Sequence, residues 1–326
     1  MNAQTMEANL SAATVGPEAV KVPAVGVADA DRRLVVGGKF LKIAEVHDEI
    51  WLEGGAVQNP EVLIARLKRE GCRADIFSFG QKIPDTTPKF SHHFEWDNFA
   101  VIPLTTYAAW WDKLPQESRR NVRIAGKKGA IIKAVEFDEN FVRGISGIYN
   151  ESPTRQGRAF PHYGKSLETV KKENGTYVER SQFIGAYLGD ELIGFIKMVY
   201  IDSVASLMQI LSKNGHLDKK PMNAMLAKAV ELAAERGSKF LVYRKYTYGN
   251  VFSPLTEFKR RNGFVELKYP RYYIPLTLKG RLAMKLRLHL GLRDALPAGL
   301  ITRLTSLRSW FNEKFGSKKS VAAPAA

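Results

Sequence analysis

The chain repeats one order of elements in its two halves. In the first half, the helix-like string PEVLIARLKREG ends at Gly71, and the strand-like strings ADIFSF and FAVIPLT follow, closing at Thr105. In the second half, AMLAKAVELAAERG ends at Gly237, and KFLVYRK and RYYIPLT follow, closing at Thr277. Glycine suits the left-handed residue that ends a helix, and the apolar runs suit buried strands. The repeat therefore predicts two similar units of helix and strand.

Two explanations fit this repeat. Duplication within the chain accounts for the shared order of helix, glycine, strand and IPLT, because self-similarity is typical of proteins built from repeated units. The alternative is two unrelated strand–helix units with a chance match in IPLT, since short apolar strings recur. We favour duplication because the features match in the same order.

The charge of the chain favours an anionic partner. Its 326 residues contain 49 Lys and Arg against 33 Asp and Glu, which gives a net charge of +16. Nucleic acid, a nucleotide-linked substrate and acidic lipid all suit such a surface. Cys72 is the single cysteine, which excludes an internal disulfide and a zinc site built from several thiolates. These observations fit the reducing cytoplasm.

Residues 1–32 are expected to be disordered, since they are rich in Ala, Val, Gly and Pro and show no helical or strand period. They lack the basic start and apolar stretch of a secretory signal. No run in the sequence reaches the length needed to span a bilayer. We therefore expect a cytoplasmic protein.

The second half contains strings that predict a hairpin, a strand, a helix, a strand, a short helix and a final strand, namely FIGAYLGDELIGFIKMVY, ASLMQILS, AMLAKAVELAAERGSKFLVYRK and FKRRNGFVE. This order resembles the GNAT acyltransferases. LPQESRRNVRIAGKKGAIIKAV and TEFKRRNGF resemble the Fem-type aminoacyl transferases of that superfamily, as an Arg-rich helix before a strand and a Phe-Lys pair before a glycine turn. The resemblance covers about 34–277. It implies an α/β (α+β) fold of two tandem GNAT-like halves around mixed sheets, which agrees with the internal repeat.

The resemblance and the composition together suggest four segments. They are a disordered segment at 1–32, a first GNAT-like half at 33–140, a second, acyltransferase half at 141–277 and a basic amphipathic helical tail at 278–326.

The donor-binding segment departs from the GNAT pattern. An acyl-CoA-binding loop carries closely spaced glycines, whose backbone N–H groups hold pyrophosphate at a helix N-terminus. Here the places are taken by Lys219, Pro221 and Asn223, and Pro221 has no backbone N–H group. The cations of Lys219 and Lys220 can still pair with phosphate. Acyl-CoA therefore remains a candidate donor, with Lys219, Lys220 and Asn223 as its contacts.

The usual GNAT acid and base are also replaced. Lys259 stands where a tyrosine often serves as the acid, and Gln209 stands where some members carry a glutamate base. An amide is not a useful proton acceptor at neutral pH. Amine acylation can instead depend on positioning and on donors that stabilise the oxyanion.

The richest polar segment follows a predicted helix near residue 149. Its side chains are Asn150, Glu151, Arg155, Gln156, Arg158, His162, Tyr163 and Lys165. Planar and point cations suit phosphate or carboxylate groups, so we expect an acceptor-binding loop facing a cleft that holds Tyr248 and Lys259. His162 and Glu151 are the candidate bases. The alternative is a solvated surface loop.

A second candidate set lies where the strand after the long helix ends, a common site position in α/β folds. Tyr243 and Lys245 are assigned to substrate binding, and Tyr248 and Lys259 to catalysis. Aromatic packing is the alternative. No metal site is expected, because His92 and His93 are adjacent and two neighbouring strand residues cannot easily face one ion.

The basic tail after Thr277 favours a membrane surface. Residues 300–315 place apolar side chains on one helical stripe among cations, and 281–292 are predicted to be helical because they are rich in helix formers, although their apolar and basic residues alternate. Such a helix binds anionic bilayers peripherally, so the protein is expected at the inner face of the membrane. Packing within the molecule is the alternative.

Three functions remain open from the sequence. The first is an N-acyl- or aminoacyltransferase that uses acyl-CoA, acyl-carrier protein or aminoacyl-tRNA and acts on an amine of an anionic nucleotide- or glycan-linked acceptor. The resemblance places such enzymes in envelope or polysaccharide biosynthesis. The second is a catalytically silent GNAT-fold scaffold attached to membranes by its tail. The third is RNA binding, which an aminoacyl-tRNA donor would entail.

Overall fold

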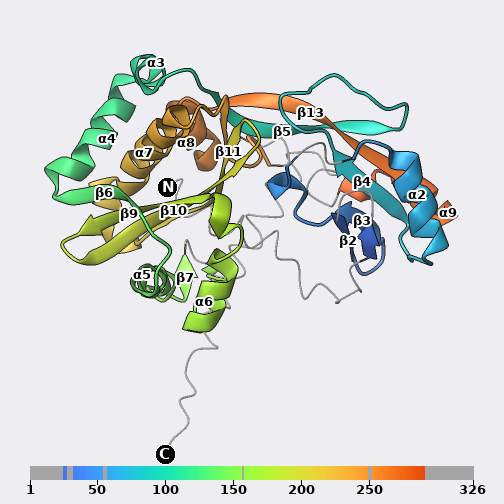
Figure 1. Ribbon diagram of the computed structural model, residues 1–326, viewed down its shortest axis with the longest axis horizontal. Coiled ribbons are helices and arrows are strands. Elements are labelled where there is room, and N and C mark those ends of the chain that lie inside the picture. Colours follow the sequence, from blue (N-terminus) through green and yellow to red (C-terminus); the bar gives the residue numbers. More distant parts are fainter. Residues whose placement is uncertain (1–24, 28–31, 54–56, 156–157, 249–251, 291–326) are drawn as a thin grey trace, which may run out of the picture.

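The computed structural model describes residues 25–27, 32–53, 57–155, 158–248 and 252–290. Most of its strands form one mixed sheet of 11 strands, in the order β1-β2-β3-β4-β13-β5-β12-β11-β10-β9-β6 (Figure 1). Strands β7 and β8 form a separate two-stranded sheet. The α/β fold class expected from the sequence is confirmed.

The strands are β1 (Val25–Val27), β2 (Arg32–Gly37), β3 (Ile43–Val46), β4 (Ile76–Gly80), β5 (Phe94–Pro103), β6 (Ala130–Val135), β7 (Thr154–Arg155), β8 (Arg158–Ala159), β9 (Ser181–Leu188), β10 (Glu191–Ile201), β11 (Val204–Ser212), β12 (Phe240–Val242) and β13 (Val265–Pro275).

The helices are α2 (Pro60–Arg69), α3 (Tyr107–Lys113), α4 (Gln116–Lys127), α5 (Glu139–Tyr149), α6 (Leu167–Asn174), α7 (Pro221–Glu235), α8 (Pro254–Arg261) and α9 (Leu278–Lys285), with short 3-10 helices η1 (Glu49–Trp51), η2 (Val178–Arg180), η3 (Asn214–Lys219) and η4 (Leu288–Leu290).

The two halves share one topology and exchange their last strands. In each half an antiparallel pair leads to a strand–helix–strand unit, β3-α2-β4 in the first and β11-α7-β12 in the second, whose two strands are parallel. The next strand of each half then crosses over, because β5 pairs with β12 and β13 pairs with β4. The tandem GNAT-like arrangement expected from the repeat is thus present.

The pairing of β5 with β13 shows how the halves are related. Their register joins Asp97 to Tyr269, which are 172 positions apart in the sequence. The same interval separates Ile102 and Ile274, the first residues of the two IPLT strings. The Asp97–Tyr269 pair therefore lies on the approximate two-fold axis that relates the halves, and this register supports duplication.

Each face of the second half has its own apolar core. Helix α7 packs on one face against Ile196, Leu207 and Ile210, with α3 and α4 beside it. On the other face, α5 packs against Phe183 and Phe195. Figure 1 shows α4 and α7 on the upper side of these strands and α5 and α6 on the lower side. Side chains of alternating residues on each strand feed the two cores.

The helix ends follow local sequence rules. Helix α2 starts with Pro60 at its first position, and the Asn59 side chain accepts a hydrogen bond from the Val62 N–H group. Gly71 and Gly237 have φ values of 66° and 77°, the left-handed conformation predicted for them after α2 and α7. The hairpin predicted at Gly189 joins β9 to β10.

Three segment predictions need comment. Val25–Val27 form β1 against β2, so disorder is the wrong expectation for these residues of 1–32. Of the helix predicted at 281–292, residues 281–285 lie in α9 and Leu288–Leu290 form η4 instead, whereas 291–292 and the stripe at 300–315 lie outside the described residues. Strand β6 lies beside β9, and the division of the chain at 140 stays a prediction.

Candidate functional site

Arg155, a residue of the predicted acceptor loop, lies inside the protein. Its side chain is 2% exposed, and its guanidinium donates to the carbonyl oxygens of Ser212 at 3.0 Å and Ile148 at 3.1 Å. It also lies 4.4 Å from the ring centroid of Phe160. The prediction that Arg155 binds an external anion is wrong, because an enclosed guanidinium that serves backbone carbonyls joins the loop to the end of β11.

Glu151 has a comparable internal role. Its carboxylate accepts hydrogen bonds from the backbone N–H groups of Asn214 at 2.7 Å and Gly215 at 2.9 Å, at the start of η3. Taking a proton would weaken both charge-assisted bonds, so the geometry opposes the prediction of Glu151 as general base. Asn150 closes the loop by accepting a hydrogen bond from the Gly164 N–H group at 2.8 Å.

His162 is buried against Tyr149, with 4.4 Å between ring centroids. Burial, together with the charges of Lys165 and Arg155, lowers the pKa of His162 to about 4. So weak a base is poorly matched to removing a proton from an ammonium group at neutral pH, which opposes its predicted role. The Lys165 ammonium contacts the Glu173 carboxylate at 2.7 Å.

The rest of the polar loop remains open to substrate. Arg158 and Tyr163 are exposed, and their assignment to substrate binding stays a prediction. Gln156 lies outside the described residues.

The two predicted residue sets lie on opposite faces of the sheet. His162 contacts Tyr149 and Phe160, which belong to the core beneath α5. Tyr243 belongs to the core beneath α7, and Lys259 contacts it. The expectation of one cleft between the loop and Lys259 is therefore wrong, because the strands stand between them. Neither sequence proximity nor polarity shows on which face of the sheet a residue lies.

The parallel strands β11 and β12 separate after three paired positions, Val204↔Phe240, Ala205↔Leu241 and Ser206↔Val242. Strand β11 stays paired with β10 up to Ser212, whereas the chain after Val242 follows β5 through the Tyr243 N–H bond to the Ala100 carbonyl at 2.8 Å. The β11 edge from Leu207 onward therefore has no strand partner on the β12 side among the described residues. We call this opening the splay.

A bulge and a helix N-terminus mark the open end of the splay. The pairing register between β10 and β11 shifts by one residue. Leu207 pairs with Met198 and Gln209 pairs with Lys197, so Met208 is an extra residue on β11. Bulges of this kind redirect side chains and are frequent beside active sites. Helix α7 begins just after β11 ends, and its N-cap Lys220 gives no side-chain hydrogen bond to the first turn. Its first N–H groups thus have no side-chain cap and are candidate donors to an anion.

Lys259 is fully buried beside this opening. Its ammonium group donates to the Lys245 carbonyl at 2.5 Å and lies 4.5 Å from the ring centroid of Tyr243 and 5.3 Å from that of Tyr248. Asn223, in the first turn of α7, donates to the Asn262 side chain at the end of α8 at 3.1 Å. The structure therefore places Lys259 beside Tyr243 and Tyr248, and the roles of these residues stay predictions.

The remaining predicted residues are more scattered. Gln209 accepts a hydrogen bond from Tyr149 at 3.1 Å and so faces α5 instead of the splay. Lys245 pairs with Asp97 at 3.0 Å. Lys219 contacts Asp218 at 3.4 Å next to the start of α7.

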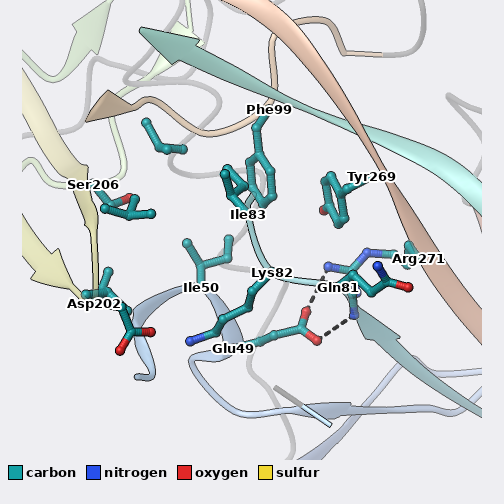
Figure 2. A pocket seen from close by; sticks show the side chains of 14 residues that line it. Glu49, Ile50, Gln81, Lys82, Ile83, Phe99, Asp202, Ser206, Tyr269 and Arg271 are labelled. Atoms are coloured by element: carbon teal, nitrogen blue, oxygen red, sulfur yellow. Dashed lines mark hydrogen bonds and ion pairs between the residues drawn. The ribbon is translucent and has the colours of Figure 1, made fainter. Parts of the chain in front are cut away.

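A pocket that we did not predict lies where the halves meet, on the α5 side of the sheet. Its empty space is about 580 Å³, including the part open to solvent. Figure 2 shows Phe99, Ile83 and Tyr269 at one end and Glu49, Gln81 and Arg271 at the other. Both halves contribute residues to this pocket. Glu49 and Gln81 come from the first half, and Asp202 and Ser206 come from the second half.

A charged network forms one side of this pocket. Arg271 contacts the Glu49 carboxylate at 2.8 Å and Asp97 at 3.4 Å, and Tyr269 donates to Asp97 at 3.0 Å. Burial opposes charge on Asp97, but Lys245 and Arg271 outweigh it and keep the pKa of Asp97 below its usual value. Charged residues inside two strands, at Asp97 and Arg271, were the sequence signal for this site.

No family model matches the chain, and no curated protein matches it in sequence. In structure it is similar to FemX, with a TM-score of 0.55, 12% identity and coverage of 81% of this chain and 89% of FemX.

Two further structures match at a similar level. The C-terminal domain described for a lysylphosphatidylglycerol synthetase from Agrobacterium fabrum has a TM-score of 0.51 and 13% identity, with coverage of 78% of this chain and 84% of that one. L-PGS from Bacillus licheniformis has a TM-score of 0.50 and 14% identity, with coverage of 79% and 85%. At such identities the likeness concerns the fold. The chain has a GNAT-like fold of the Fem type.

Proposed function

We propose that the chain transfers an acyl or aminoacyl group from an activated donor to an amine. The observation that carries this proposal is the splay, where a strand edge, an uncapped helix N-terminus and a buried lysine converge. An extended donor arm can add to the free β11 edge as a further strand. Its phosphate groups would then meet the N-terminus of α7 and the Lys219 and Lys220 cations.

The chemistry needs few protein groups. A neutral amine attacks the carbonyl carbon of the donor, and the carbonyl oxygen takes up negative charge. The bond to the donor's sulfur or oxygen then breaks, and the leaving thiolate or alkoxide takes up the proton that the amine loses. Lys259 places positive charge beside the opening, and Tyr248 lies next to it. Both favour a developing oxyanion electrostatically. Of the acid and base candidates chosen from the sequence, only these two lie at the splay.

The donor class and the acceptor belong to this proposal. Acyl-CoA, acyl-carrier protein and aminoacyl-tRNA all present an activated carbonyl on a phosphate-bearing carrier, which suits a chain of net charge +16. The name of one similar structure, lysylphosphatidylglycerol synthetase, supports an aminoacyl donor and a lipid surface. An amine on a nucleotide- or glycan-linked acceptor in envelope synthesis is the other candidate.

A donor screen tests the proposal. Purified chain is incubated with labelled acyl-CoA, acyl-carrier protein or aminoacyl-tRNA, together with anionic vesicles or amine-bearing nucleotide sugars. We expect one donor class to raise the melting temperature and to be consumed only when an acceptor is present. If all three donors leave the melting temperature unchanged and none is consumed, the chain is not a transferase of this kind.

A membrane-bound scaffold is the second candidate, and helix α9 favours it. Leu278, Leu282 and Leu286 are 79%, 58% and 58% exposed and lie on one side of the helix at intervals of four residues. Lys279, Arg281 and Lys285 lie between them. Apolar side chains ringed by cations suit the surface of an anionic bilayer. Among the helices that the structure describes, none has the length and apolar character needed to cross a bilayer.

A further inference from the structure

Two histidines and a glutamate from distant parts of the chain meet beside the β5–β13 pair. His93 precedes β5 and Glu95 lies within it, so their side chains leave the same face of the strand. His289 belongs to η4, near the end of the described residues. One ligand atom from each residue lies within 4.8 Å of the others, and His93 Nε2 is 3.4 Å from Glu95 Oε1.

The His289 ring is a buried polar side chain. Its side chain is 6% exposed, and neither ring nitrogen has a well-formed hydrogen bond within the part of the chain that the structure describes. The Ala283 carbonyl is near enough to interact with the ring. Leaving a buried polar group without a good partner costs about 1–3 kcal/mol. A bound ion would give one nitrogen a partner, while Ala283 fixes the tautomer through the other.

The Glu95 carboxylate is also placed to bind an ion. Its Oε1 atom faces His93, whereas its Oε2 atom lies 3.8 Å from the Arg287 guanidinium. Arg287 reduces the negative charge on Glu95 but leaves Oε1 free to bind through one oxygen. An outer cation that orients a ligating carboxylate is a usual part of metal sites.

We propose that His93, Glu95 and His289 bind a zinc ion. Two imidazole nitrogens and one carboxylate oxygen form a ligand set that zinc accepts, and a fourth position is left for water. Magnesium and calcium prefer oxygen ligands and do not suit two imidazoles. The ligand atoms need small side-chain rotations to reach zinc–ligand distances near 2.0–2.2 Å. His93 is half-exposed, which gives its ring room to turn.

The ion would join the C-terminal segment to the centre of the sheet. Glu95 is the register partner of Arg271, whose guanidinium forms the side of the central pocket. His289 follows α9, which carries the exposed leucines, and its ring meets Tyr273 of β13 at 4.6 Å. Zinc at this point would therefore fix the position of α9 against the strand pair that both halves share.

Zinc titration of the untagged, full-length chain tests the site. After treatment with EDTA and its removal, calorimetry should show one zinc ion bound per chain and the melting temperature should rise with zinc. Cobalt in place of zinc should give visible absorption bands of a tetrahedral site. We expect two variants to weaken zinc binding at least tenfold: His289→Phe, which keeps the ring contact with Tyr273, and His93→Gln. Tenfold is about the smallest loss typical of removing even an outer partner of a metal ligand.

His92 supplies the matched control. It is adjacent to His93, but its Nε2 atom contacts Glu61 at 3.0 Å, outside the cluster. His92→Gln should bind zinc as the unmodified chain does. If His289→Phe does not fold, His93→Gln alone tests the site. The His93 side chain is 51% exposed, so its replacement should not prevent folding. Failure of the unmodified chain to bind zinc, or binding that survives His93→Gln, overturns the proposal.

Discussion

Helices α2 and α7 occupy equivalent places in the two halves, and they start differently. Both begin with proline, at Pro60 and Pro221. The first turn of α2 is capped by the Asn59 side chain, whereas Lys220 before α7 has a left-handed φ of 55° and gives no such cap. A capped terminus stabilises its helix, and an open one keeps N–H groups for a ligand.

The strand pairs beside these helices also differ, since one is closed and the other is open at its end. In the first half β3 and β4 also pair at three positions, but η1 follows β3 and places the Glu49 carboxylate against the Gly80 N–H group at 2.6 Å. In the second half β11 runs on beyond its pairing with β12 as a free edge. The first half thus contains a closed unit and the second half an open one, and we place the chemistry in the open unit.

The helices that follow the two IPLT strings differ as well. Thr106 caps α3 and Thr277 caps α9, each through its side-chain oxygen. Trp110 of α3 is buried and donates to the Asn262 carbonyl at 3.1 Å. Helix α9 instead exposes leucines. Helix α3 therefore packs into the core of the second half, while α9 presents an apolar surface.

The strongest test of the open unit is Lys259→Met. Lys259 contacts the splay, and Lys197 is an equally buried lysine that donates to the Asn174 carbonyl at 2.8 Å on the other face. We expect Lys259→Met to lower kcat by about 10²-fold, the effect of removing an oxyanion-stabilising donor. Lys197→Met should lower the melting temperature but spare the kcat of folded protein. Equal losses of kcat in both variants would remove Lys259 from the site.

The polar loop has no counterpart among the described elements of the first half, and two arginines divide its roles. Arg155→Met should reduce the free energy of unfolding by about 1–3 kcal/mol, because the carbonyl groups of Ser212 and Ile148 would lose their buried donor. Arg158→Ala should leave the free energy of unfolding unchanged, because the Arg158 side chain is exposed. Denaturant unfolding measures both effects. Unchanged stability of Arg155→Met would contradict its internal role.

His162 should make stability depend on pH. Because its folded pKa is about 4 and its ordinary value is 6.5, the unfolded chain binds more protons between these values. Stability from this residue is present above pH 6.5 and is lost as pH falls toward 4, by at most about 3 kcal/mol at 1.4 kcal/mol per pKa unit. Urea unfolding of His162→Phe at pH 7 and pH 5 should show a smaller difference than the unmodified chain. An equal difference would place the titration elsewhere.

The apolar surface of α9 can be tested against α3. Leu282→Ser should weaken sedimentation with anionic vesicles about fivefold, because one leucine contributes about 1 kcal/mol when partly inserted. Trp111→Phe in α3 is the control and should not affect sedimentation. High salt should weaken binding further, since the cations around Leu282 interact with lipid phosphates. Equal binding of Leu282→Ser and the unmodified chain would leave α9 as a packing helix.

The smallest effect concerns the two prolines. Pro221→Gly adds one backbone N–H group at the start of α7, so CoA or pyrophosphate should bind tighter by about 1 kcal/mol, near the value of one hydrogen bond. Pro60→Gly makes the same change at the capped start of α2 and should have no effect on either ligand. Calorimetry distinguishes the two variants. If neither variant alters binding, the phosphates of the donor do not lie at α7.

The sequence by itself determined the repeated elements and their ends, because helical spacing, glycine caps and strand alternation are local properties of the chain. It also predicted Tyr243 and Tyr248 after a strand end and Lys259 beside them, and these three side chains are in contact. It misplaced Arg155, Glu151 and His162, because polarity does not show whether a side chain meets solvent or a buried carbonyl.

Only the tertiary structure decided the exchange of β5 and β13 between the halves. That exchange builds the central pocket from both halves and brings Arg271 to Asp97 across 174 positions. It likewise decided that His289 meets His93, since a contact between distant residues depends on how strands pair and twist. Local patterns predict which residues face a core, but the pairing of strands selects which distant residues share it.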